Sequence, residues 1–132
     1  MIFASTFLRR ALLADAVFSG VSAIGLTFGA GVFASLFNLP EPLLRETGLF
    51  LIVYAGLVGW LASRSSVPKL LVILVVIGNA AWTIASIALL FSGAVSPNLA
   101  GELTVVAQAI ATGMFAELQY VGVRKSGSPV TA

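Results

Sequence analysis

The chain has 132 residues, of which 59% are hydrophobic and only 9% are charged, and its net charge is +2. Soluble domains carry about 25% charged residues, so a surface this poor in charge indicates a chain that folds in a lipid bilayer. The absence of cysteine and histidine excludes disulfides, thiolate or His-ligated metal sites, and His general-base catalysis. We therefore expect no cofactor and no metal, and the few Lys and Arg form no stripe for nucleic acid.

Four apolar stretches are each long enough to cross a bilayer, which takes about 20 helical residues. They predict spans over residues 12–37, 43–63, 70–91 and 99–123. Because the connections between them are short, neighbouring spans should be antiparallel and adjacent. The predicted fold is an all-α membrane protein, an antiparallel up-down-up-down bundle of four transmembrane helices that forms one domain over residues 1–132.

The start of the chain resembles a signal peptide, because Arg9 and Arg10 precede an apolar run. Asp15 interrupts that run, however, and the run continues to Leu36, which is too long for a signal core. We therefore expect a retained first span.

The distribution of basic residues predicts the orientation of the spans. Six of the seven lie at the termini or in the second connection, and one lies in the first: Arg9, Arg10, Arg64, Lys69, Arg124 and Lys125 against Arg45. Loops rich in Lys and Arg stay in the cytoplasm, so both termini should be cytoplasmic.

Polar residues within the first span fall on one face of the helix. Asp15, Ser19 and Ser22 follow helical spacing, and Gly25 and Gly29 continue their stripe. Small residues let membrane helices approach closely, so Gly25 and Gly29 predict a helix-packing contact. The alternative is a polar track that leads inward from Asp15.

The second and third spans carry further polar groups. Asn79 and Thr83 share a face of the third span, and Tyr54 adds a hydroxyl to the second. Counted from Lys69, Asn79 lies about 15 Å deep. An unpaired amide at that depth is costly, so Asn79 should hydrogen-bond a neighbouring helix or a ligand.

The fourth span has polar groups on two opposite sides, and both cannot face one narrow interior. Glu117 lies on one side, and the other carries Thr104, Gln108, Thr112 and Gln119. Asp15 and Glu117 lie about 8 Å inward from Arg10 and about 10 Å inward from Arg124. Carboxylates in membranes are rare and usually pair or function. These two are either ion-paired with nearby Arg or Lys, or protonatable sites. The candidate polar or ligand-binding residues are Asp15, Ser19, Ser22, Tyr54, Asn79, Thr83, Gln108 and Glu117.

Several segments resemble a group of small bacterial four-span inner-membrane proteins. They are Phe115–Gly122 (FAELQYVG), Gly78–Trp82 (GNAAW), Leu39-Pro40 and Arg45–Gly48, and the resemblance covers roughly residues 9–124. It implies a bacterial cytoplasmic membrane and no particular activity. The small multidrug resistance transporters also have four short spans and an acidic residue in the first. Theirs is a Glu in a distinctive sequence that this chain lacks, and many have little charge bias.

Three functions fit these observations. We expect a non-enzymatic accessory or assembly subunit, or a binding protein for a lipid-like ligand, that contacts the bilayer and other membrane subunits or a second copy of itself. The first alternative is a small oligomeric transporter that uses Asp15 or Glu117 as a proton or cation site. The second is a membrane enzyme acting on lipid or quinone, although no catalytic motif is recognisable.

Overall fold

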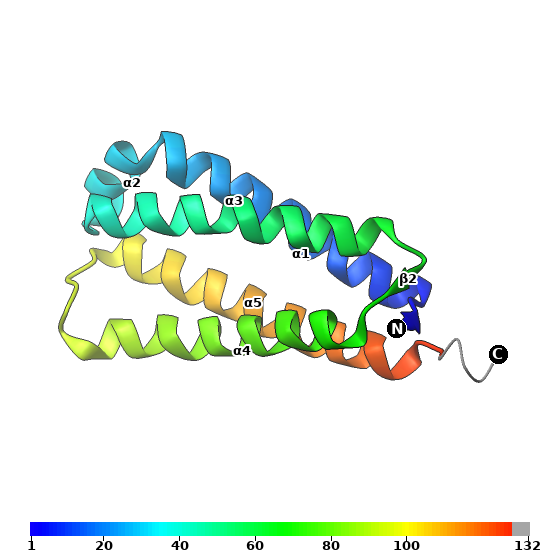
Figure 1. The fold of residues 1–132 in the computed structure, drawn as a ribbon. Coiled ribbons are helices and arrows are strands. Elements are labelled where there is room, and N and C mark those ends of the chain that lie inside the picture. The colour runs from blue at the N-terminus through cyan, green and yellow to red at the C-terminus, as the bar shows by residue number, and fades with distance from the viewer. Residues whose placement is uncertain (128–132) are drawn as a thin grey trace.

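The computed structural model describes residues 1–127, and most of them are helical (Figure 1). The elements in chain order are β1 (Ile2–Phe3), α1 (Thr6–Phe28), α2 (Ala30–Phe37), α3 (Glu41–Ser63), β2 (Ser66–Val67), α4 (Lys69–Ser92) and α5 (Leu99–Lys125). Four of the helices, α1, α3, α4 and α5, are long and apolar enough to cross a membrane. The prediction of an all-α chain with four candidate spans is confirmed.

The first predicted span, 12–37, is two helices rather than one. Helix α1 begins at Thr6, where the Ser5 hydroxyl accepts a hydrogen bond from the Leu8 amide at 3.1 Å, and the chain breaks at Gly29 before α2. A side chain at Gly29 would begin 2.7 Å from the Gly25 carbonyl oxygen and 3.1 Å from the ring of Phe33. Gly25 and Gly29 therefore make room for the break and for the Phe33 ring, not for another long helix.

The long helices lie in two pairs (Figure 1). Helix α1 packs most extensively against α3, α4 packs against α5, and α1 also contacts α5. Glycines allow the closest approaches. A Cβ at Gly122 of α5 would lie 2.8 Å from the Cα of Leu8 in α1, and one at Gly48 of α3 would lie 2.6 Å from the amide nitrogen of Thr27.

Apolar side chains fill the two ends of the helix assembly. One cluster, near the termini, includes Leu8, Leu12, Val58, Leu61 and Val72, and the other, near α2, comprises Ala30, Leu39 and Leu44. Along α1 and α3, the segment between these clusters contains the polar residues described below.

Both ends of the described chain and the α3–α4 connection lie together (Figure 1). Strand β1 pairs with β2 through Ile2 and Val67, and the Phe3 amide donates to the Gly127 carbonyl at 2.7 Å. Six basic residues from three separate segments therefore lie at or near one end of the molecule. Arg45, near the start of α3, lies towards the opposite end. We call the first the basic end.

The outer surface of the long helices is apolar. Val21 on α1, Val53 on α3 and Ile84 on α4 are 68%, 73% and 70% exposed, and all lie well inside their helices. A continuous apolar surface of this kind would aggregate in water and is suited to hydrocarbon.

Candidate functional site

A buried carboxylate joins all four long helices. Asp15 of α1 is 1% exposed and accepts four hydrogen bonds. Oδ1 accepts from the Ser19 hydroxyl at 2.9 Å, and Oδ2 accepts from the Tyr54 hydroxyl at 2.7 Å, Asn79 Nδ2 at 2.9 Å and Gln119 Nε2 at 2.7 Å. These five residues, which we call the Asp15 cluster, come from α1, α3, α4 and α5.

The amide groups of the cluster have one self-consistent orientation. Asn79 Nδ2 donates one proton to Asp15 and the other to Gln119 Oε1 at 3.0 Å. If the Asn79 amide were turned over, its oxygen would face Asp15 Oδ2 and Gln119 Oε1, which are both acceptors, and both hydrogen bonds would be lost. An ionised carboxylate only accepts hydrogen bonds and has about two sites on each oxygen, so the three donors crowd Oδ2, while Oδ1 accepts only from Ser19.

No basic side chain contributes to this site. Within residues 1–127 the only ion pair joins Arg45 to Glu41, which lie one turn apart in α3. Asp15 was predicted either to pair with a nearby Arg or Lys or to be a protonatable site, and within residues 1–127 its partners are all neutral hydrogen-bond donors. Hydroxyl and amide donors neutralise no charge, but they satisfy the lone pairs that burial would otherwise leave empty.

Depth explains why these residues meet. Counted from the nearest basic residue, Asp15 and Asn79 are expected at about 8 and about 15 Å, yet they are hydrogen-bonded. Arg10 lies inside α1, which begins at Thr6, whereas Lys69 is the first residue of α4. Counted from the helix starts, both side chains lie about 14–15 Å along their helices.

A second polar group extends the cluster along α4 and α5. The Thr83 hydroxyl lies 3.0 Å from the Asn79 carbonyl, 3.0 Å from the Ala109 carbonyl and 2.8 Å from the Thr112 hydroxyl. Thr83 thus connects the backbone of both helices beside Asn79. It contributes to the α4–α5 contact without touching Asp15.

Other predicted site residues lie elsewhere. Trp82 Nε1 donates to Gln108 Oε1 at 2.8 Å, so Gln108 links α5 to α4 outside the cluster. Ser22 is half-buried, and within residues 1–127 its hydroxyl has no hydrogen-bond partner. Glu117 is exposed on α5 and makes no hydrogen bond or ion pair with any described residue. Asp15 and Glu117 therefore do not form a pair.

Gln119 is the cluster residue that the candidate set lacks. Its side chain is fully buried and connects Asp15 to Asn79. Its position on the same side of α5 as Gln108 and Thr112 is a usable signal. That side faces the interior, while Thr104, nearer the start of the helix, is exposed. The sequence left open only whether this side of the fourth span or the side of Glu117 faces the interior.

The cluster does not line either of two surface hollows near the basic end. One is lined by Thr6, Arg9, Arg10, Leu13 and Ala62, and the other by Arg10, Leu13, Ala14, Val17, Phe18 and Phe115. Within the described residues there is also no group of three or more acidic side chains placed to hold a metal ion. Chemically, the Asp15 cluster can fix four helices relative to one another.

Comparisons with protein-family models, with curated proteins and with solved structures each found no match to this chain. The resemblance to small four-span bacterial proteins therefore stays a prediction.

Proposed function

We propose that this chain is an integral protein of the bacterial cytoplasmic membrane, an up-down-up-down antiparallel bundle with both termini in the cytoplasm. The four candidate spans support membrane insertion. The orientation draws on the six basic residues gathered at the end where β1, β2 and the C-terminal part of α5 meet. Cytoplasmic segments carry the excess of Lys and Arg.

The proposed role is that of a non-enzymatic membrane component: an accessory or assembly subunit, or a binding protein for a lipid-like ligand. One observation carries this proposal, the hydrogen bonding of both Asp15 oxygens by Ser19 of its own helix and by Tyr54, Asn79 and Gln119 of the three others. A carboxylate whose two oxygens both accept hydrogen bonds from its own protein, with donors on three other helices, acts as a clamp between helices. Neither oxygen is without a donor from within the protein.

A small proton- or cation-linked transporter is the second candidate, and one observation favours it. Asp15 is buried among apolar helices without a cationic partner in the described residues. Ionisable groups in this position often mark ion pathways. Glu117 gives no support to the transporter candidate, because it is exposed and forms no hydrogen bond with the Asp15 cluster.

Reconstitution into liposomes separates the two candidates. Purified wild-type protein, Asp15→Asn and Glu117→Gln are compared for proton and potassium flux under an imposed gradient, and for resistance to unfolding. A clamp predicts that Asp15→Asn lowers stability and that none of the three proteins carries flux above protein-free liposomes. A flux that wild type and Glu117→Gln share and Asp15→Asn lacks, with folding retained, would replace the clamp with transport.

A further inference from the structure

A shallow groove runs from the basic end along the outside of α1. Its walls are Arg10, Leu13, Ala14, Val17 and Phe18 of α1, together with Phe115 of α5. Their spacing of three and four residues places the α1 members on one face over about 12 Å of helix. The rings of Phe18 and Phe115, which line the groove away from Arg10, meet edge to face with their centroids 5.6 Å apart.

The groove is apolar along its length and basic at its mouth. Leu13 and Val17 are 55% and 58% exposed, so the groove opens to the surroundings of the protein. Arg10 is the one charged residue that lines it, and Arg10 also lines the neighbouring hollow with Thr6 and Arg9. A ligand that fits must be apolar over most of its length and anionic at one end.

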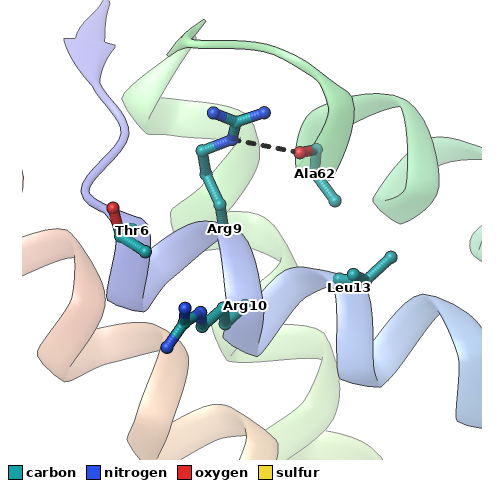
Figure 2. A pocket seen from close by; sticks show the side chains of 5 residues that line it. All are labelled: Thr6, Arg9, Arg10, Leu13 and Ala62. Carbon is teal, nitrogen blue, oxygen red and sulfur yellow. Dashed lines mark hydrogen bonds between the residues drawn. The ribbon is translucent and has the colours of Figure 1, made fainter.

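The Arg10 guanidinium is free to bind an anion. Arg9 already has a partner within the protein, because its Nε donates to the Ala62 carbonyl at 3.4 Å. Arg10 extends away from Arg9 (Figure 2). Within residues 1–127 Arg10 has no acidic partner, since the only ion pair is at the other end of the molecule. Planar guanidinium groups match phosphate oxygens in a two-point hydrogen-bonded arrangement.

We propose that this groove binds one anionic phospholipid of the cytoplasmic leaflet, with its phosphate on Arg10 and an acyl chain against Leu13, Val17 and Phe18. The inference rests on the proposed membrane insertion, which places Arg10 at the level of the headgroups. Charge decides among occupants: a second copy of the chain would bring its own basic end, whereas an anionic lipid complements Arg10. Arg10 selects anionic over zwitterionic lipid, because the choline cation of a zwitterionic headgroup offsets its phosphate charge.

The test uses nanodiscs made from equal amounts of phosphatidylglycerol and phosphatidylcholine of the same acyl length. The full-length protein is released into the gas phase, and the retained lipid is counted by native mass spectrometry. Wild type should retain one phosphatidylglycerol in preference to phosphatidylcholine. Arg10→Gln should lower that preference about fivefold, the equilibrium ratio that corresponds to the attraction of one basic residue to anionic lipid.

Two matched variants control for charge and bulk. Arg64→Gln removes the same charge from the basic end at a residue that contacts Trp60 and lines neither hollow, so it should leave the preference unchanged. Ala14→Trp fills the groove from an exposed position and should reduce retention of either lipid. Ala81→Trp, at an exposed position on α4, should not.

Other outcomes overturn the proposal. If Arg10→Gln and Arg64→Gln lowered the preference for phosphatidylglycerol equally, the effect would be one of nonspecific charge. Dimers that retain no lipid would assign the groove to a second copy of the chain. Displacement by soluble glycerol 3-phosphate at the lipid's concentration would assign the site to free phosphate esters. Membrane insertion is checked separately by reporter fusions. A correctly inserted protein that retains no lipid refutes only the lipid site, and a protein that fails to insert refutes the proposed function itself.

Discussion

Replacing Asp15 by Leu should destabilise the protein more than any other single carboxyl change. The substitution removes the acceptor for four hydrogen bonds. The Ser19 hydroxyl can turn to the carbonyl one turn back in its own helix, which leaves three donors, from Tyr54, Asn79 and Gln119, without this acceptor.

The structure sets the size of the effect. A buried donor left unpaired costs about 1–3 kcal/mol, so three donors give about 3–9 kcal/mol. Interhelical hydrogen bonds measured in membranes average only about 0.6 kcal/mol, which sets a lower limit of about 2 kcal/mol for the three together. The free energy of unfolding should therefore fall by about 2–9 kcal/mol. Asp15→Asn should lose less, because its amide oxygen can still accept and its amide nitrogen can donate to Ser19.

Reversible unfolding in bicelles, followed by tryptophan fluorescence, measures this loss. Glu117→Leu and Glu117→Gln are the matched controls, because they remove a carboxyl from a neighbouring helix at a position that is exposed and unbonded. Their free energies of unfolding should lie within about 0.5 kcal/mol of wild type, as for other surface substitutions. If Asp15→Leu lost no more than Glu117→Leu, the cluster would not stabilise the fold and the clamp would be refuted.

Three further predictions concern packing, a hydrogen bond and topology. Gly122→Ala should destabilise by about 1–3 kcal/mol, because its new methyl group would lie 2.8 Å from the backbone of Leu8, whereas Gly56→Ala, with nothing within 4 Å, should be neutral or stabilising in the same unfolding assay. Trp82→Phe should lose about 0.5–1.5 kcal/mol, because Gln108 loses the indole donor; an unchanged unfolding midpoint would contradict this. Reporter fusions at the C-terminus and in the α4–α5 turn should report cytoplasm and periplasm respectively, and an outward C-terminus or dual insertion would overturn the orientation.

Hydropathy predicted the long helices well, because a helix that crosses lipid needs about 20 consecutive apolar residues and hydropathy measures that property directly. The predicted bounds 43–63, 70–91 and 99–123 fall within α3, α4 and α5, each of which is longer by one or two residues at one or both ends. The break at Gly29 was not predictable in this way, since residues 30–37 are even more apolar than α1. Gly25 and Gly29 were predicted to mark a contact between helices, and the side chain they accommodate is the ring of Phe33 in the short helix α2.

The polar residues of the candidate site were identifiable, but their partners were not. Asn79 was predicted to hydrogen-bond because an unpaired amide in an apolar span is costly, and it is hydrogen-bonded. Whether Asp15 would meet an arginine, Glu117 or neutral groups depends on how α1 and α5 are rotated. That rotation follows from close contacts such as that of Gly122 with Leu8. No pattern within one helix contains this information.

The arrangement of the Asp15 cluster also accounts for the alignment of the helices. Apolar surfaces in lipid provide little resistance to sliding, because lipid tails are as apolar as the side chains they would replace. Sliding one helix by a turn moves its side chains by about 5.4 Å. The interhelical bonds to Asp15 are only 2.7–2.9 Å long, so such a shift would break them. Because Tyr54, Asn79 and Gln119 each come from a different helix, one carboxylate fixes the depth of the other three.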